Sequence, residues 1–284
     1  IGSNGSLKNQ MEQAKAAIFY PPKGLNSLII GPTGSGKTFF ANAMYQYSQD
    51  KGIIEPKQSL IIFNCADYSQ NPQLLMSHLF GHTKGAYTGA TEAKEGLLLK
   101  ADNNMLFLDE IHRLPPEGQE MLFYFMDTGT FQPMGETEKR YSAKVRIICA
   151  TTEDPSSALL KTFVRRIPVT IQLPAFNERP ANERIQLLKL LLSIEANRID
   201  KRIVIEENVV KALLGSVTYG NIGQLKSSIQ LACAKAFLNS MDNNEEMLIN
   251  MELLTEELQD GLVNLARNRD ELNEISNYLE PRMI

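Results

Sequence analysis

The sequence predicts an α/β fold in which the first 174 residues form a three-layer sandwich around a parallel five-stranded sheet, followed by a small all-α domain. Short runs of consecutive apolar residues alternate with helical patterns, and none of these runs alternates with polar residues. Strands that are buried on both faces of a parallel sheet have this composition. The runs lie at residues 28–30, 60–63, 105–108, 145–149 and 169–173.

Helical patterns replace the strand-like runs after residue 174. They lie at residues 183–197, 206–214 and 224–239, and they predict a small helical domain over residues 175–240 behind the α/β domain of residues 1–174. A polar cluster at 242–246 interrupts the pattern, after which Leu254, Leu258, Leu262 and Leu265 recur at helical spacing. We interpret residues 241–284 as a helical connector to a further domain, although periodicity alone equally allows a helix packed on the same small domain.

Charge and length restrict the classes of function. The 284 residues allow one large or two modest domains, and the net charge of −4 gives no basic field that would neutralise a nucleic-acid backbone. No apolar stretch reaches membrane-spanning length and no signal peptide is recognisable, so a cytoplasmic protein without membrane contact is expected. Because the chain starts at Ile1 rather than methionine, we expect it to be a piece of a longer protein.

The cysteines and histidines do not predict a metal centre. Cys65, Cys149 and Cys233 are far apart in the sequence and are expected to be reduced residues of the core. The histidines, at 78, 82 and 112, lack the acidic and cysteine neighbours of a zinc site, so packed or solvated side chains are expected.

A glycine-rich loop joins the first apolar run to a helix expected over residues 39–49. This order of strand, loop and helix is typical of a triphosphate site, in which backbone N–H groups, the helix N-terminus and a lysine hold the phosphates and a hydroxyl holds Mg²⁺. Lys37 would bind the phosphates, and the Thr38 hydroxyl would bind Mg²⁺. The alternative is that this segment is a chance glycine turn. The loop consists of Gly31, Pro32, Thr33, Gly34, Ser35, Gly36, Lys37 and Thr38.

Two adjacent carboxylates end the third apolar run, where ligands bind in open α/β sheets. Asp109 would anchor Mg²⁺ and Glu110 would orient, or accept a proton from, the water that attacks the γ-phosphate, unless the pair is only a solvated turn. Asn64, which ends the second run, could hydrogen-bond Glu110 or simply cap the following turn. The guanine-specific Asn-Lys-x-Asp pattern is absent, which favours ATP over GTP.

A second loop carries a single aromatic residue, Tyr87, between glycine hinges. It lies between residues 79–80 and a helical run expected at 93–100, and it lacks apolar neighbours that would bury the ring. Long loops in compact domains usually contact a partner. The loop consists of Gly81, His82, Thr83, Lys84, Gly85, Ala86, Tyr87, Thr88, Gly89 and Ala90.

These motifs together resemble the AAA+ ATPases that activate sigma-54 RNA polymerase. The Leu79-Phe80-Gly81-His82 segment and the loop that follows it are similar to the family's substrate loop, with Tyr87 in place of the usual Phe. The resemblance covers nearly all of residues 1–240. Residues 64–68 and 114–120 look most like the LevR-type subgroup, which regulates operons of the sugar phosphotransferase system.

The resemblance implies a role for each matching position. Asn64 and Glu110 match the pair that reports the γ-phosphate to the substrate loop, Thr151 and Thr152 match sensor I, and residues 132–135 match the second pore loop. Arg165, with Arg166 beside it, lies where the family places an arginine finger that reaches the neighbouring subunit's ATP. The implied active form is a homo-oligomeric ring, expected to be a hexamer, with DNA contact through domains outside this chain. Sigma-54 contact is implied for Gly85, Ala86, Tyr87, Thr88, Gly89 and Ala90.

Three departures from the family pattern keep other functions open. Thr152 replaces the usual sensor I Asn, Leu159 replaces the first finger arginine, and Gly223 replaces the sensor II arginine. The last two motivate an alternative, an ATP-dependent assembly switch with weak or no hydrolysis. Asp109-Glu110-Ile111-His112 also spells the acidic motif of DExH helicases, but a small helical domain is expected here instead of a second RecA-like domain.

Overall fold

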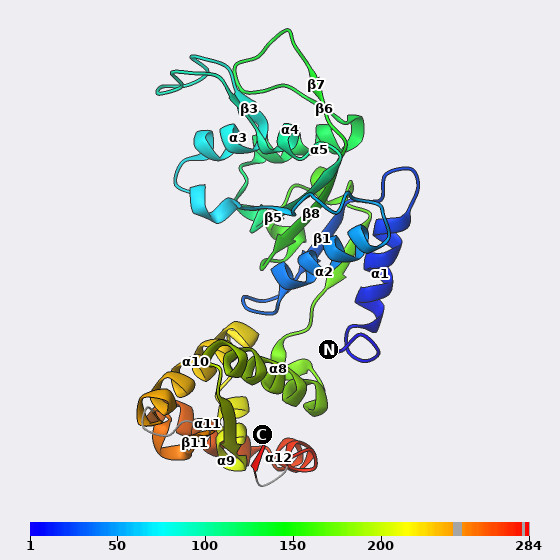
Figure 1. The fold of residues 1–284 in the computed structure, drawn as a ribbon. Coiled ribbons are helices and arrows are strands. Elements are labelled where there is room, and N and C mark those ends of the chain that lie inside the picture. Colours follow the sequence, from blue (N-terminus) through cyan, green and yellow to red (C-terminus); the bar gives the residue numbers. More distant parts are fainter. Residues whose placement is uncertain (241–245, 280–281, 284) are drawn as a thin grey trace. The chain divides into compact units, whose positions relative to one another are not determined.

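The computed structural model describes residues 1–240, 246–279 and 282–283. Two compact units make up the chain (Figure 1). We call Lys8–Gly31 with Lys37–Leu173 the sheet unit, and Ile1–Leu7, Pro32–Gly36 and Pro174–Ile284 together the helical unit.

A five-stranded sheet in the order β2-β5-β8-β1-β9 forms the centre of the sheet unit, and all its neighbouring strands are parallel. The parallel α/β fold class is therefore confirmed. The register pairs Asn64 with Asp109 and Ile30 with Thr151, so the strand ends that carry polar residues lie at one edge. The strands are β1 (Ser27–Ile30), β2 (Ile61–Asn64), β5 (Asn104–Asp109), β8 (Val145–Thr151) and β9 (Val169–Gln172).

Helices cover both faces of this sheet. Leu28, Leu106 and Cys149 face a core shared with helices α3, α4, α5 and α7, whereas α1 and α2 lie on the opposite side (Figure 1). The helices are α1 (Lys8–Phe19), α2 (Lys37–Asp50), α3 (Pro72–Phe80), α4 (Leu97–Lys100), α5 (Pro116–Thr128), α6 (Pro155–Ala158) and α7 (Lys161–Val164), with 3-10 turns η1 (Cys65–Tyr68) and η2 (Ile111–Arg113).

Two short antiparallel ribbons extend from the sheet unit (Figure 1). One pairs β3 (Gly81–His82) with β4 (Lys94–Glu95), and the other pairs β6 (Thr130–Phe131) with β7 (Tyr141–Ser142). The helix expected over residues 93–100 is therefore shorter than the sequence indicated. Lys94 and Glu95 instead pair with Gly81 and His82, a contact between segments that local periodicity does not register.

The helical unit contains five α-helices and a small sheet among its described residues. The sheet was not expected. Ile203, Val204 and Ile205 are buried in one short strand, and Met247 and Ile249 in another. The two strands pair across about 40 residues, a spacing too long for a local pattern to reveal. The elements are η3 (Phe176–Glu178), α8 (Ala181–Ile199), β10 (Arg202–Glu206), α9 (Glu207–Gly215), α10 (Asn221–Asn239), β11 (Glu246–Ile249), η4 (Met251–Leu253), α11 (Glu256–Arg267), α12 (Arg269–Ser276) and β12 (Arg282–Met283).

Helix α11 packs against α9 inside this unit. A Cβ on Gly215 would lie 2.1 Å from the carbonyl oxygen of Gly261, so the two backbones approach more closely than any larger residue allows. Leu258 and Leu265 are buried in the same core. Of the two alternatives for the tail, the structure thus has the helix packed on the small domain. Residues 242–245 of the polar cluster lie outside the described residues, and Glu246 begins β11.

Within the described ranges, none of the helices combines the length and apolar character that crossing a bilayer requires.

Candidate functional site

Polar side chains gather at the carboxyl edge of the sheet, where β2, β5 and β8 end. Asn64 ends β2, Asp109 ends β5 with Glu110 directly after it, and Thr151 ends β8. The register places these strand ends side by side. Ligands of open α/β sheets bind outside this edge, so the sheet brings together residues that are up to 87 positions apart in the sequence.

Lys37 starts helix α2 and faces this edge. Its Nζ donates a hydrogen bond to the carbonyl oxygen of Gly31 over 2.9 Å, and the residue is only 7% exposed. Burial lowers the pKa of the Lys37 ammonium, and attraction to Asp109 and Glu110 opposes this shift. A buried cation beside two carboxylates and a helix N-terminus is suited to an anion with several charges, such as a polyphosphate.

The backbone of the glycine loop has conformations that only glycine adopts readily. Gly34 has φ +73° and Gly36 has φ +99°, in the left-handed region that a Cβ disfavours. Within the helical unit, Asn221 Nδ2 donates to the carbonyl oxygen of Thr33 at 3.0 Å, and the Gly223 N–H donates to that of Gly34 at 3.3 Å. The loop is thus held by one side chain and one backbone N–H from the start of α10, and the Asn221 contact is one that sequence reasoning missed.

Asp109 and Thr38 fit a magnesium ion by the chemistry of their donor atoms. Burial raises the pKa of the Asp109 carboxyl, while the hydrogen bond from the Glu110 N–H (3.0 Å) and the Lys37 charge lower it. The described residues contain no cluster of three or more His, Cys, Asp or Glu side chains that could hold a metal. A single carboxylate with a hydroxyl suits Mg²⁺, which keeps waters and substrate phosphates as its remaining ligands.

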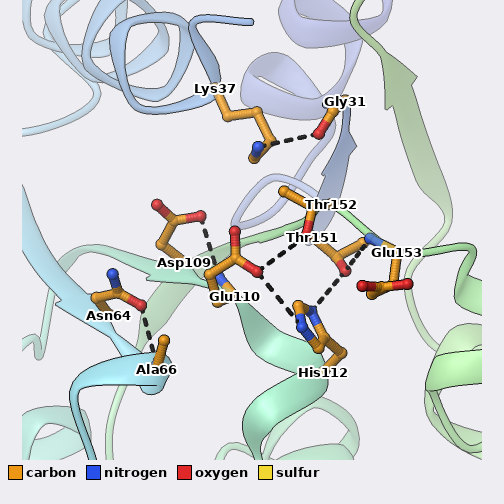
Figure 2. A network of polar contacts seen from close by, with 10 residues as sticks. All are labelled: Gly31, Lys37, Asn64, Ala66, Asp109, Glu110, His112, Thr151, Thr152 and Glu153. Atoms are coloured by element: carbon orange, nitrogen blue, oxygen red, sulfur yellow. Dashed lines mark hydrogen bonds and ion pairs between the residues drawn. The ribbon is translucent and has the colours of Figure 1, made fainter. Parts of the chain in front are cut away.

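The Glu110 carboxylate contacts side chains from the residue that follows β8 and from η2 (Figure 2). Thr152 Oγ1 donates to Glu110 Oε2 at 3.1 Å, and His112 Nε2 lies 3.4 Å from the same oxygen. His112 Nδ1 lies 2.9 Å from Thr151 Oγ1, which also accepts the Glu153 N–H at 3.1 Å. Glu110 itself has left-handed backbone angles (φ 51°, ψ 46°), which turn the chain so that His112 lies over its side chain.

Of the two alternatives left open for Asn64, the structure shows the turn cap. Its Oδ1 accepts the Ala66 N–H at 2.9 Å and caps the 3-10 turn η1 (Figure 2). Among the described residues no hydrogen bond joins Asn64 to Glu110, so the pairing that the family resemblance implies is not present in this structure. The turn that begins directly after β2 offers an unpaired backbone N–H close to the Asn64 side chain, and this local partner is satisfied first.

Tyr87 is half-buried instead of fully exposed. Its ring packs edge-on against His82 with centroids 5.2 Å apart, and its hydroxyl lies 3.4 Å from Ser77 Oγ. His82 and Ser77 are themselves buried and hydrogen-bonded, 2.5 Å apart. His82, at the start of the loop, and Ser77 of α3 thus cover part of the ring, a contact that the sequence did not indicate.

The loop around Tyr87 is joined to residues 132–135. The Thr83 N–H donates to the carbonyl oxygen of Met134 at 3.0 Å, and the Met134 N–H donates to that of Gly81 at 2.9 Å. A Cβ on Gly135 would lie 2.7 Å from Thr83 Oγ1, so the two loops are in close contact. Of the sequence-identified residues, Gly85, Thr88 and Gly89 are exposed, Ala86 is half-buried and Ala90 is buried.

Arg165 and Arg166 follow helix α7 and have different surroundings. Arg166 Nε contacts Asp127 Oδ2 at 3.1 Å, and its guanidinium lies 4.9 Å from the Phe123 ring centroid. Arg165 is exposed. Leu159, which stands where the family has another arginine, is buried.

His112 is the residue of the sheet edge that sequence reasoning did not assign. The signal available was its position two residues after Glu110, which brings a side chain back toward the carboxylate only when the intervening chain makes a tight turn. The three cysteines are buried free thiols, as expected.

Comparisons with known proteins point to one family. The profile described as "Sigma-54 interaction domain" matches residues 1–172. The transcriptional regulatory protein LevR of Bacillus subtilis is 52% identical over 279 residues, which cover 98% of this chain and 30% of LevR. DagR of Salmonella typhimurium is 47% identical over 250 residues, 87% of this chain and 26% of DagR. The chain thus spans less than a third of the length of these curated relatives.

Solved structures share the fold. NtrX from Brucella abortus in complex with ATP has a TM-score of 0.70 at 21% identity and covers 96% of this chain and 60% of NtrX. The RuvB Holliday junction branch migration motor of Thermotoga maritima has a TM-score of 0.55 at 16% identity and covers 92% of this chain and 67% of RuvB. At these identities the similarity concerns the fold alone.

Proposed function

The chain belongs to the sigma-54 interaction domain family, as a LevR-like AAA+ member, and on this basis we propose that it hydrolyses ATP and uses the energy to remodel sigma-54 RNA polymerase so that promoters open. The observation that carries the ATPase is the Glu110 carboxylate, which accepts a hydrogen bond from Thr152 and lies 3.4 Å from His112 Nε2, beside Asp109 at the sheet edge that Lys37 faces. We also propose that DNA contact is made by parts of the full-length protein outside this chain, and that the protein works in the cytoplasm.

Each residue of the sheet edge has a task in this proposal. The glycine loop from Gly31 and the Lys37 ammonium would bind the phosphates of ATP, while Thr38 and Asp109 would hold Mg²⁺, which neutralises charge on the transferred phosphoryl group. Glu110 would orient the attacking water and accept its proton. Thr152 donates to Glu110 Oε2 and leaves Oε1 for the water.

A neighbouring copy would complete the site. Arg165 is exposed and follows α7, whereas Arg166 contacts Asp127 and Phe123 of its own chain. We therefore assign the trans-acting finger to Arg165. Such a finger accelerates phosphoryl transfer about 10³- to 10⁵-fold. Because the arginine comes from a neighbouring subunit, we propose that the active form is a ring, and that this ring is a hexamer.

The Tyr87 loop is the proposed contact to sigma-54. It projects from the sheet unit together with residues 132–135, to which it is hydrogen-bonded. Gly85, Thr88 and Gly89 are exposed, so a partner can reach the loop backbone. Tyr87 would leave Ser77 and His82 when the loop engages the polymerase.

Lys37→Ala and Glu110→Gln test the assignment of the site. In a phosphate-release assay both variants should lose nearly all turnover, whereas titration with a fluorescent ATP analogue should show weak binding for Lys37→Ala and near-normal binding for Glu110→Gln. The exposed Lys51→Ala is the matched control for Lys37. Unchanged turnover in both site variants would remove the assigned site.

An assembly switch with weak or no hydrolysis is the second candidate. Two observations favour it: Leu159 is buried where the family has an arginine, and Gly223 has only a backbone contact to the glycine loop. Turnover measured against protein concentration separates the two functions. Hydrolysis that rises steeply as the ring assembles supports the ATPase, and no hydrolysis in the assembled ring supports the switch.

A further inference from the structure

His112 is an enclosed histidine with both ring nitrogens engaged. Its side chain is 9% exposed, with Nδ1 2.9 Å from Thr151 Oγ1 and Nε2 3.4 Å from Glu110 Oε2 (Figure 2). The imidazole therefore bridges the end of β8 and the carboxylate that follows β5. Buried polar side chains usually have polar partners, and the partners of this ring are Thr151 and Glu110.

A donor role for His112 toward Glu110 requires a hydrogen on Nε2. Thr151 Oγ1 accepts the Glu153 N–H at 3.1 Å and can donate its own hydrogen to His112 Nδ1, which lies 2.9 Å away. In that arrangement Nδ1 accepts and the hydrogen lies on Nε2, the nitrogen that is 3.4 Å from Glu110 Oε2. A doubly protonated ring also carries hydrogen on Nε2. Only the neutral Nδ1–H tautomer would turn a lone pair toward the carboxylate, which is electrostatically unfavourable.

We propose that His112 is a positioning residue for Glu110, in the place where the family resemblance suggested Asn64. Asn64 Oδ1 accepts the Ala66 N–H and Asn64 makes no hydrogen bond to Glu110 among the described residues, whereas Glu110 Oε2 accepts from Thr152 and lies 3.4 Å from His112 Nε2. Two donors on one oxygen fix the carboxylate plane and leave Oε1 for the attacking water. The inference rests on the proposed ATPase function, because the orientation of Glu110 matters only if Glu110 acts on water.

The backbone explains why a histidine at this position reaches Glu110. Glu110 has positive φ, and the Arg113 N–H donates to its carbonyl oxygen at 2.9 Å, which closes the first turn of η2. Ile111 is completely buried and anchors that turn. The His112 ring is thereby directed back toward the carboxylate.

Kinetics of His112→Ala and His112→Gln in the intact chain test the proposal. Removing a hydrogen bond to a charged group should lower kcat by about 10- to 100-fold, with the Kd of a fluorescent ATP analogue changed less than about threefold. Gln places an amide N–H near the position of Nε2, so His112→Gln should recover most of kcat. His78→Ala, which removes a histidine that stacks on Tyr68 away from the site, is the matched control and should keep wild-type turnover.

The tautomer provides a readout that does not depend on turnover. Long-range ¹H–¹⁵N spectra of the nucleotide-free chain distinguish Nε2–H from Nδ1–H imidazole, and His112→Gln identifies the signals among the three histidines. We expect hydrogen on Nε2. Thr151→Val keeps the volume and removes the hydroxyl, and should reduce both the Nε2–H population and kcat, so the proposal stays testable if His112→Ala does not fold.

Each outcome decides the inference. A neutral Nδ1–H tautomer, or a wild-type kcat in His112→Ala, overturns it. Equal loss of kcat in the Ala and Gln variants also overturns it, because a donor role predicts that the amide N–H of Gln restores kcat. If the wild-type chain hydrolyses no ATP at any concentration, the proposed function fails by itself, and the tautomer still shows whether His112 donates to Glu110.

Discussion

Asp109 carries its charge at a disadvantage in the folded chain. Burial raises the pKa of its carboxyl, more than the Glu110 N–H and Lys37 lower it. A raised folded-state pKa means that ionisation of Asp109 opposes folding. A divalent cation at this position would reverse that disadvantage, which is consistent with the magnesium role proposed for Asp109.

Asp109→Asn should therefore stabilise the nucleotide-free chain at neutral pH. The increase in Tm should shrink as the pH falls through the folded-state pKa and vanish below about 3.9, where the unfolded wild-type chain is also protonated. Thermal melts at several pH values measure this, with the exposed Asp50→Asn as the matched control. A variant that is less stable than wild type at neutral pH would contradict the account, and loss of turnover is expected alongside the gain in Tm.

At the scale of elements, the two ribbons act as one projecting body. The β3–β4 loop is hydrogen-bonded to the β6–β7 loop through Thr83, Met134 and Gly81. Tyr87 fastens the outer part of the first loop to α3, because its ring packs on His82 and its hydroxyl lies near Ser77. A phenylalanine would keep the ring contact and lose the hydroxyl contact.

Tyr87→Phe should loosen the loop without unfolding the sheet unit. The contact is long, so a net contribution near the lower end of about 0.5–1.5 kcal/mol is expected, which corresponds to roughly a two- to fivefold faster amide exchange over residues 85–90. Hydrogen–deuterium exchange measures the change, and Ser77→Ala should reproduce it. Tyr68→Phe, which keeps its stacking on Phe63, is the control. Equal protection in Tyr87→Phe and wild type would show that the hydroxyl does not hold the loop.

At the scale of the whole molecule, the proposed ring predicts complementation between inactive subunits. Arg165→Ala and Glu110→Gln should each be inactive alone. In a random equal mixture, about a quarter of the interfaces combine an intact Glu110 with an intact Arg165 of the neighbour, and about that share of the wild-type turnover should return.

Phosphate release by the mixture measures this recovery. Arg166→Ala is the matched control and should keep far more activity than Arg165→Ala, since Arg166 contacts Asp127 and Phe123 of its own chain. A mixture that stays as inactive as its components would show that Arg165 does not act across a subunit interface.

The fold and the phosphate-binding part of the site were open to sequence reasoning because they depend on neighbours in the chain. Buried parallel strands appear as continuous apolar runs, and the glycine loop, Lys37 and Thr38 are adjacent residues whose spacing carries the chemistry. Asp109 and Glu110 follow directly from the end of such a run. The small sheet of the helical unit could not be predicted from the sequence, because β10 and β11 are separated in the chain by the whole of α9 and α10.

By itself the sequence determined the family, the parallel α/β architecture and the residue types of the nucleotide site, because local order fixes periodicity and motif spacing. Only the tertiary structure decided which donors hold Glu110, that Asn64 caps a turn, and that Tyr87 packs on Ser77 and His82. These contacts depend on which side chains lie within hydrogen-bonding distance in the folded chain. A hydrogen bond has a reach of about 3 Å, and no pattern along the chain measures distance between segments 40 residues apart.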